Sequence, residues 1–217
     1  MSKYESFIQK CLETETEQQK RGTEVGPVIL SRLEKNLERN FPAKFQELSY
    51  PFALKLKSIN NQEQFDLYHR SYVQVFRQEI KTRGGTIVSY GEAQKPVNIF
   101  LKEYVEKSQL LDPSQSARLS PLLHVTLDGV TVAYMQSFFR EEFDAYITPA
   151  SRTTGLIDTL HAPQFKNRDL SDSLQQQLLF INLEIYSAWQ KWFRDIHPQR
   201  PVLLDAVWSI ARQTLLS

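Results

Sequence analysis

Cysteine and histidine, which hold most structural metals, are scarce in this sequence of 217 residues. The single cysteine, Cys11, excludes an internal disulfide and any zinc or iron–sulfur site built from several cysteines. The four histidines, His69, His124, His161 and His197, lie far apart and lack the spacing of metal ligands. We therefore expect a protein that uses neither a metal nor an organic cofactor.

Long apolar segments and excess charge are also missing. No apolar run reaches the roughly 18 residues that a membrane-spanning helix requires, so no span is expected. The first residues are polar and lack the apolar core of a signal peptide, which predicts a protein that stays in the cytoplasm. The net charge of +1 argues against a protein that coats nucleic acid. It does not exclude a compact enzyme that touches a few phosphates through a local basic patch.

Glycine is rare as well, with 7 residues, and the apolar residues repeat at helical rather than strand spacing. The pattern predicts an all-α protein: one orthogonal helical bundle over residues 1–217, in which 1–40 can form an N-terminal extension. The proline-containing segment 42–60 is expected to be an irregular connection or a short strand pair, and 147–170 a long loop. Helices are expected at residues 2–20, 27–40, 61–81, 92–110, 128–146, 171–196 and 201–215.

The first segment with a chemical signature runs from Ser89 to Leu101 and contains Lys95 followed by Pro96. Proline has no amide proton and is tolerated in the first turn of a helix, so we expect a helix to begin close to Lys95. The free amides of a helix start favour an anion such as a DNA phosphate. A lysine held neutral at this place can act as a nucleophile and form a Schiff base. The alternative is an ordinary surface lysine near a helix start.

The second segment places Asp128 at the start of an apolar helix, between Leu127 and Val130. Aspartate is a favoured N-cap, because its carboxylate accepts hydrogen bonds from free backbone amides, and capping alone would explain the residue. An ionised carboxylate at such a position can also stabilise positive charge that develops on a sugar.

Together the two segments resemble the helix-hairpin-helix DNA glycosylase superfamily, in particular its archaeal 8-oxoguanine DNA glycosylase branch. In that superfamily a hairpin ending in glycine precedes a helix with the catalytic lysine, and an aspartate opens the next long helix. Gly91, Lys95 and Asp128 stand at these positions here. The lysine and the aspartate are 33 residues apart, an interval similar to that of the archaeal branch. The resemblance covers roughly residues 80–146.

The sequence departs from the superfamily pattern at three points. The usual hairpin of the Leu-Pro-Gly-x-Gly type is replaced by the segment from Gly84 to Gly91, and Thr126 stands where the superfamily often has proline. Asp205 follows a short apolar run before an expected helix and is a second candidate for the carboxylate. Asp128 is preferred because its order and interval fit; Asp205 would then cap the last helix or line a base pocket.

The resemblance implies an enzyme that flips a modified base out of double-stranded DNA and excises it, with Lys95 as nucleophile and Asp128 as its carboxylate partner. The covalent imine would also give it AP lyase activity, and we expect it to act as a monomer. Both groups should then face one cleft, a few ångströms apart. The residues expected to contact the DNA backbone are Arg77, Lys81, Arg83 and Gly91. The residues expected in the base pocket are Tyr90, Gln94, Asn98, Trp189, Trp208 and Asp205.

Three functions remain open at this point. Bacterial phage-defence glycosylases that resemble the archaeal branch excise glucosylated hydroxymethylcytosine, and we favour this base. The abundance of glutamine and asparagine argues against a hyperthermophilic source, which supports the bacterial alternative. Repair of 8-oxoguanine is the second function. The third is a helical interaction module without activity, in which Lys95 and Asp128 are only structural.

Overall fold

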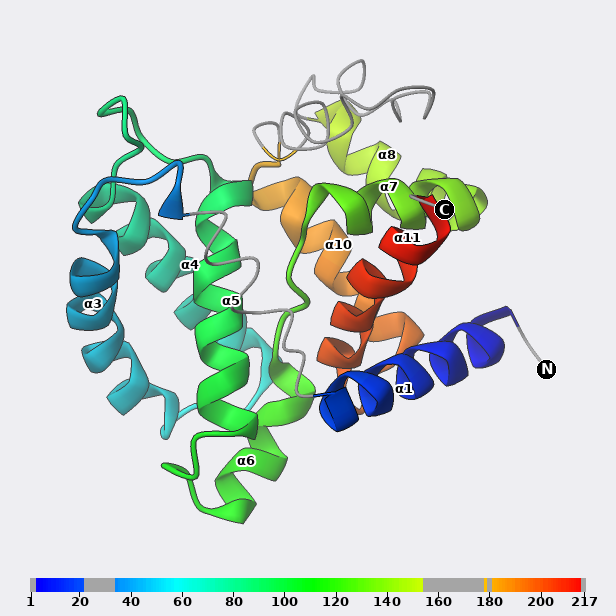
Figure 1. The fold of residues 1–217 in the computed structure, drawn as a ribbon, viewed down its shortest axis with the longest axis horizontal. Helices are drawn as coiled ribbons and strands as arrows, with labels where there is room; N and C mark the ends of the chain where they lie inside the picture. The colour runs from blue at the N-terminus through cyan, green and yellow to red at the C-terminus, as the bar shows by residue number, and fades with distance from the viewer. Residues whose placement is uncertain (1–2, 22–33, 154–177, 179–180, 216–217) are drawn as a thin grey trace.

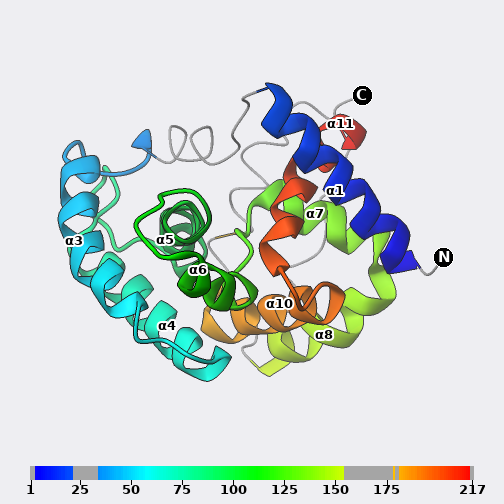
Figure 2. The same cartoon turned by 90° about the horizontal axis from the view of Figure 1, so that it is seen from below.

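The computed structural model describes residues 3–21, 34–153, 178 and 181–215. Within these residues it contains α-helices and short 3-10 helices and no strand, so the predicted all-α class is confirmed. Helix α5 (Tyr90–Glu106) runs through the middle of the molecule (Figures 1 and 2). On one side of it lie α3 (Phe41–Leu56) and α4 (Gln62–Glu79). On the other side lie the N-terminal helix and the C-terminal helices.

This second group comprises α1, α7, α8, α10 and α11, which cross at steep angles (Figure 2). The bounds are Lys3–Arg21 for α1, Gly129–Phe138 for α7, Arg140–Thr153 for α8, Leu183–Ile196 for α10 and Val207–Leu215 for α11. The short α6 (Pro113–Leu119) and the 3-10 helix η1 (Ser120–Leu122) lie at the end of α5. A second 3-10 helix, η3 (Pro201–Ala206), leads into α11.

Side-chain caps fix where several of these helices begin. Asn61 accepts a hydrogen bond from the backbone of Gln64 at the start of α4, and Asn182 accepts one from Ile185 at the start of α10. Asp112 forms a capping box with Gln115 at α6. These polar residues satisfy amides that would otherwise have no partner, so the sequence sets the helix boundaries locally.

Helix α3 corrects the prediction of an irregular connection at 42–60. Pro42 occupies the first turn of α3, where its missing amide proton has no helical partner to lose. Pro51 lies inside the helix on its exposed side. Apolar side chains, including Phe41 and Leu56, are buried and hold the helix in place against the disruption by Pro51. Tertiary packing therefore overrides the proline signal.

Two other predicted helices differ from the structure. The single helix expected at 128–146 is divided at Phe139, whose ring packs against Phe7 of α1 with centroids 4.8 Å apart. In the predicted helix 27–40, residues 35–40 form turns rather than a helix, and Leu37 pairs with Thr82 through an isolated bridge. Most of that prediction lies outside the described residues.

The expected long loop at 147–170 begins later than predicted, because α8 continues to Thr153; the rest lies outside the described residues. Of the helix expected at 171–196, α10 covers 183–196, and most of the remainder lies outside the described residues too. Among the described helices, none combines the length and the apolar character that crossing a membrane requires.

Candidate active site

Helix α5 begins five residues before Lys95, which corrects the predicted helix start. Ser89 is the N-cap, and it forms a reciprocal capping box with Glu92. Pro96 therefore lies inside the helix, and the ammonium of Lys95 lies in the second turn rather than at the positive helix end. The signal was present in the sequence, because Ser-x-x-Glu is a capping-box pattern. The capping box at Ser89, rather than Pro96, sets the start of the helix.

Asp128 is the N-cap of α7, as its position before an apolar helix predicted. Its Oδ1 accepts a hydrogen bond of 3.0 Å from the amide of Val130. Residues 123–128, which precede the helix, form an extended segment without regular secondary structure. This segment runs alongside α5 and is bonded to it through Gln94 and Asn98. It therefore places Asp128 next to α5, although the two are distant in the sequence.

Lys95 and Asp128 are brought together by these two elements. The Lys95 Nζ lies 2.9 Å from Oδ2 of Asp128. The side chains retain 9% and 19% of their exposure, so the pair is largely buried but keeps a path to solvent. One carboxylate oxygen binds the helix amide and the other binds the amine, which fixes the carboxylate in a single orientation.

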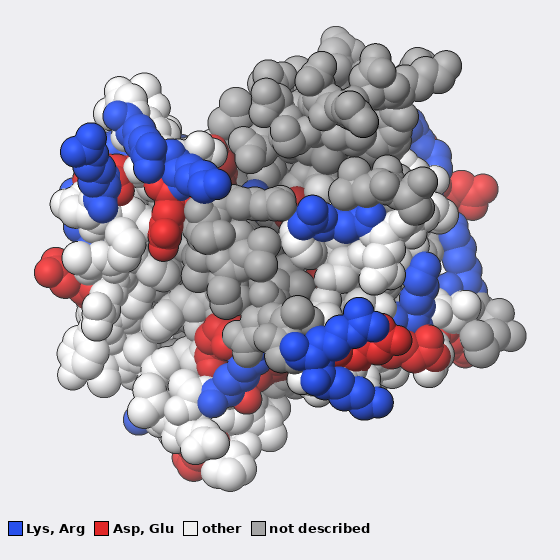
Figure 3. Space-filling view, viewed as in Figure 1, with Lys and Arg blue, Asp and Glu red and all other residues white. Residues whose placement is uncertain are grey.

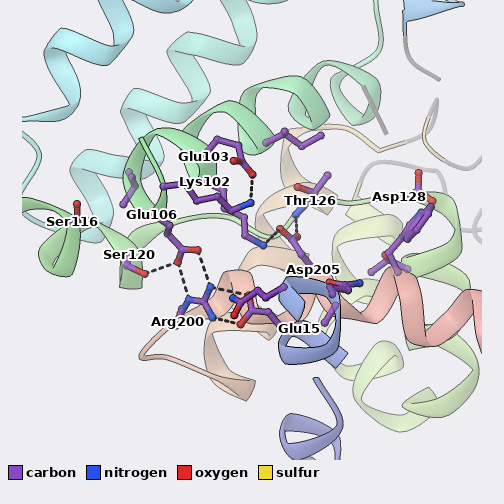
Figure 4. A pocket seen from close by; sticks show the side chains of 18 of the residues that line it. Glu15, Lys102, Glu103, Glu106, Ser116, Ser120, Thr126, Asp128, Arg200 and Asp205 are labelled. Carbon is purple, nitrogen blue, oxygen red and sulfur yellow. Dashed lines mark hydrogen bonds and ion pairs between the residues drawn. The ribbon is translucent and has the colours of Figure 1, made fainter. Parts of the chain in front are cut away.

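A cavity of about 710 Å³ opens beside Asp128. Lys95 contacts Asp128 but does not itself line this cavity, so only the carboxylate faces the cleft that was expected to hold both groups. Asp128 lines it together with Thr126, Ile99, Thr131 and Trp208. Figure 4 shows Asp128 at one end of the cavity, Asp205 and Thr126 further along it, and an Arg200 cluster at the other end. A volume of this size is typical of small-molecule sites. No group of three metal-ligating side chains occurs among the residues that the structure describes.

The chain matches no protein-family model, no curated protein and no solved structure. A function for this chain therefore has to be inferred from the geometry of the Lys95–Asp128 pair and of the cavity beside Asp128.

A second lysine–carboxylate pair lines the same cavity. Lys102 Nζ lies 3.0 Å from Oδ2 of Asp205, and the other carboxylate oxygen of Asp205 accepts from the Thr126 amide at 2.8 Å. Sequence reasoning placed Asp205 in the pocket but missed Lys102. The missed signal was its spacing: Lys102 follows Lys95 by seven residues, about two helical turns, and so shares its face of α5.

Arg200 closes the far end of the cavity. Its guanidinium makes two hydrogen bonds to Glu15 of α1 and two to Glu106 of α5, at 2.6 to 2.9 Å. The hydrogen bonds that Arg200 donates to Glu106, opposed by burial, raise the pKa of Arg200. Ser120 also donates to Glu106. The cluster thus joins α1, α5 and η3 through fully charged, mutually paired groups.

Gln94 and Asn98 do not reach the cavity, contrary to their predicted place in a base pocket. Gln94 is fully buried, and Asn98 is 2% exposed. The amide of Gln94 bonds the backbone of Leu127, while Asn98 bonds the carbonyl of Val125 and the hydroxyl of Tyr186. Both side chains hold the extended segment against α5 from the core side.

The predicted aromatic residues occupy different environments. Trp208 lines the cavity next to Ile99, with the Arg212 guanidinium 4.7 Å from its ring centroid. Trp189 is fully buried in α10 among other aromatic rings, so it cannot stack on a base in this conformation. Tyr90 is 6% exposed and packs against Tyr186. Its hydroxyl is buried, without a hydrogen-bond partner among the described residues.

The predicted DNA-contacting residues surround the turn between α4 and α5. Basic side chains gather at this corner of the molecule, to the upper left in Figure 3. Lys81 and Arg83 are partly or fully exposed, whereas the Nε of Arg77 donates to the carbonyl of Val88 at 2.8 Å and so holds the turn. The turn itself contains Gly85 in the left-handed region, with φ of 78°.

Gly91 has a packing role rather than a visible surface role. It is buried, and a Cβ at this position would overlap the carbonyl oxygen of Leu178 and approach the Cβ of Ile181 at 3.0 Å. The glycine therefore allows α5 to pass close to the chain that leads into α10. Its predicted contact with DNA would require its buried backbone to become accessible.

Proposed function

We propose that this protein is a DNA glycosylase with AP lyase activity, which excises a modified base through Lys95 and Asp128. The observation that carries the proposal is the 2.9 Å contact between amine and carboxylate at the edge of a cavity. A nucleophile in contact with a group that can accept its proton is the arrangement that covalent catalysis requires. The all-α architecture is also the one that the resemblance to the helix-hairpin-helix glycosylases implies.

The chemistry would follow from the two side chains. The glycosidic bond breaks and the base departs with its electron pair, leaving positive charge on the sugar that the carboxylate of Asp128 stabilises. Asp128 is also the group that can accept the proton of the Lys95 ammonium. The neutral amine attacks C1′, and opening of the sugar ring converts the adduct to an imine. Loss of a C2′ proton from the imine then expels the 3′ phosphate by β-elimination.

The base would enter the cavity next to Asp128, since flipped bases are read by stacking and by hydrogen bonds to their edges. Trp208 and Ile99 offer apolar surface there, and the Lys102–Asp205 pair offers a donor and an acceptor. We propose glucosylated hydroxymethylcytosine as the base. The cavity of about 710 Å³ continues beyond this point to polar side chains, which leaves room for a hydroxyl-rich substituent.

8-Oxoguanine is the second candidate base, and a specific observation favours it. This base differs from guanine by an N7–H donor beside a new carbonyl oxygen. Asp205 can accept from the first and Lys102 can donate to the second, because the two groups lie 3.0 Å apart on the cavity wall.

The DNA backbone would lie across the corner between α4 and α5. Lys81 and Arg83 are accessible cations in the turn between α4 and α5, and phosphate contacts of this kind position a duplex without specifying its sequence. Arg77 would act indirectly through the Val88 carbonyl that it holds. The partner is thus double-stranded DNA with a modified base, bound by one copy of the chain.

Base release from defined duplexes tests the proposal. The duplexes carry glucosylated hydroxymethylcytosine, 8-oxoguanine, uracil or no modification, and they are incubated with wild type, Lys95→Ala and Asp128→Asn. Release from one modified duplex by wild type, and not by Lys95→Ala, is the expected result. Absence of release from every duplex, with a correctly folded protein, would instead favour the helical interaction module.

A further inference from the structure

We infer that Gln94 is a positioning residue, whose amide group sets the place of Asp128 relative to Lys95. The inference rests on the proposed function, because it assigns Gln94 a part in the same reaction. It replaces the contact with the base that the sequence suggested for Gln94, since this side chain is fully buried.

Gln94 pairs with both backbone groups of Leu127. The side-chain nitrogen of Gln94 donates to the Leu127 carbonyl at 2.7 Å, and its side-chain oxygen accepts from the Leu127 amide at 3.2 Å. One side chain thereby satisfies both backbone groups of one residue, as a neighbouring strand would do. The same nitrogen donates to the carbonyl of Gly91, and the same oxygen accepts from Asn98. The amide is therefore held from four directions.

The contact between Gln94 and Leu127 lies directly beside the contact between Lys95 and Asp128. Gln94 immediately precedes Lys95, and Leu127 immediately precedes Asp128. The contact between Gln94 and Leu127 thus lies one residue away, on both segments, from the contact between Lys95 and Asp128. The extended segment 123–128 belongs to no helix or sheet that could fix its place. Its alignment with α5 depends on side chains.

A second glutamine makes an equivalent contact further from the reactive pair. Gln190 of α10 donates to the carbonyl of Val125 and accepts from its amide, both at 2.9 Å. It is also buried, with 2% exposure. Gln190 holds the segment three residues before Asp128 and from a different helix. It is therefore the matched control for Gln94, with the same chemistry at a greater distance from the site.

Replacing Gln94 by glutamate tests whether the two hydrogen bonds to Leu127 matter, because a carboxyl group can form both of them only when it is protonated. A protonated glutamate has an O–H donor and a carbonyl acceptor, so it can reproduce both bonds to Leu127. An ionised glutamate only accepts, and it would face the carbonyl oxygens of Leu127 and Gly91 without a proton to donate. Gln94→Glu should therefore work when its carboxyl is protonated and fail when it ionises. Gln94→Met has neither group at any pH.

The experiment measures base release in single turnover at saturating enzyme, from pH 5.5 to pH 8, for wild type, Gln94→Glu, Gln94→Met and Gln190→Met. We expect Gln94→Met to lose about 100-fold in rate, the scale on which a misplacement of about 1 Å acts, with little change in duplex affinity. Gln94→Glu should approach the wild-type rate at low pH and fall away from it as the pH rises. Gln190→Met should stay within about threefold of wild type, because Asn98 still holds the Val125 carbonyl.

Hydrogen exchange of the Leu127 amide is measured on the same proteins. It tests the contact between Gln94 and Leu127 even if the proposed base release fails. Gln94→Met should lose protection at Leu127, whereas Gln190→Met should keep it. A folded Gln94→Met with the wild-type rate would overturn the positioning role. If wild type releases no base at all, the proposed function fails. Unchanged protection of Leu127 in Gln94→Met would still overturn the inference by itself.

Discussion

The polar side chains on the two sides of helix α5 differ in charge and in the partners that they bind. The side toward the cavity carries Lys102, which lines the cavity, and Lys95, whose partner Asp128 lines it. Each lysine is paired with an aspartate from another part of the chain. The face toward the core carries Gln94 and Asn98, which are neutral and bonded to backbone and to other buried groups. All four lie between positions 94 and 102 of one helix, which therefore places charged and uncharged polar groups in different surroundings within about two turns.

The core-side network continues well beyond α5. The Nε2 of His69 donates to Asn98 at 2.6 Å, and Tyr186 lies within hydrogen-bond distance of both Asn98 and His124. His124 reaches Asp66 at 2.8 Å. Burial without a matching charge disfavours ionised groups at the centre of this network, and the carboxyl of Asp66 lies at its partly exposed edge. The two lysine–aspartate pairs each keep some exposure to solvent. We therefore expect substitutions on the core side of α5 to change mainly the free energy of unfolding. Substitutions on the cavity side should change mainly the rate of base release.

The largest effect is expected from Lys95→Ala on the cavity face. Removing the proposed nucleophile should lower the rate of base release by at least about 10⁴-fold. Removing one of several residues that act together in covalent catalysis lowers the rate of other enzymes on this scale. Single-turnover kinetics on the responsive duplex measures this. A loss of less than tenfold would show that Lys95 forms no bond to the sugar.

Asp128→Asn should have the next largest effect. Asparagine caps a helix about as well as aspartate, so the start of α7 should change little. The free energy of unfolding should fall, because the largely buried Lys95 loses its charged partner. The charge that stabilises the sugar is lost, which should lower the rate about 10² to 10³-fold. Kinetics and urea denaturation are measured together. A large loss of stability with the rate unchanged would make Asp128 a cap only.

On the core face, Asn98→Leu should act on stability instead. It leaves His69, Tyr186 and the Val125 carbonyl with fewer partners, at a cost of about 3 kcal/mol in the free energy of unfolding. Urea denaturation measures the change. Glu103→Gln on the same helix is the control, because its pair with Lys107 is solvent-exposed and should contribute less than about 1 kcal/mol. Equal effects of the two variants would contradict the division between the faces.

The same network predicts how stability depends on pH. Burial lowers the pKa of His69 well below 6.5, and burial also lowers that of His124, although its bond to Asp66 opposes the shift. The unfolded chain therefore binds protons that the folded chain does not. Stability from these groups is complete above about pH 6.5 and is lost as the pH falls below it, by up to about 1.4 kcal/mol per pH unit for each histidine.

Urea denaturation at pH 7.5 and pH 5.5 checks this sign. The midpoint should be lower at pH 5.5. Asp66 and Arg194 face His124, and Tyr186 lies between the two histidines. The carboxyl of Asp66 has a lowered pKa, because its bond and charge contact with His124 outweigh burial; its own contribution is lost only at more acid pH. A midpoint that stays constant or rises at pH 5.5 would contradict the prediction.

The smallest effect is expected from Lys102→Met. It removes the cation next to Asp205 but keeps the aliphatic stem against the cavity wall. Since Lys102 would read the base and form no covalent bond, we expect about a tenfold loss in base release, comparable with one hydrogen bond to a charged group. The covalent intermediate should still form. A loss as large as that of Lys95→Ala would remove the distinction between the two lysines.

The sequence predicted those parts of the fold that depend on local signals. The helical class followed from apolar periodicity, and Asp128 at the start of α7 followed from the preference of aspartate for caps. It failed where packing outweighs a local signal. Pro51 lies within α3, and the apolar stretch after Asp128 is broken at Phe139 to allow contact with α1.

The site shows the same division. Lys95 and Asp128 could be paired from the sequence, because a resemblance supplied the long-range relation that spacing alone lacks. Gln94 and Asn98 were placed in the cavity because they flank Lys95. Gln94 directly precedes Lys95, and a rotation of about 100° per residue turns it to a different face of the helix. Asn98, three residues after Lys95, lies closer to the face of Lys95, and it is buried because Val125 and Tyr186 pack over it. The direction of each face depends on where α4, α10 and the segment 123–128 pack, which no local pattern specifies.

The measurement that tests the central claim most directly is identification of the residue joined to DNA. The wild-type protein is incubated with the modified duplexes in borohydride, which reduces an imine to a stable amine, and the adduct is digested and sequenced by mass spectrometry. We predict one adduct, on one type of modified duplex, with the sugar remnant on Lys95. An adduct on Lys102 or another lysine, or release of base without any adduct, would contradict it.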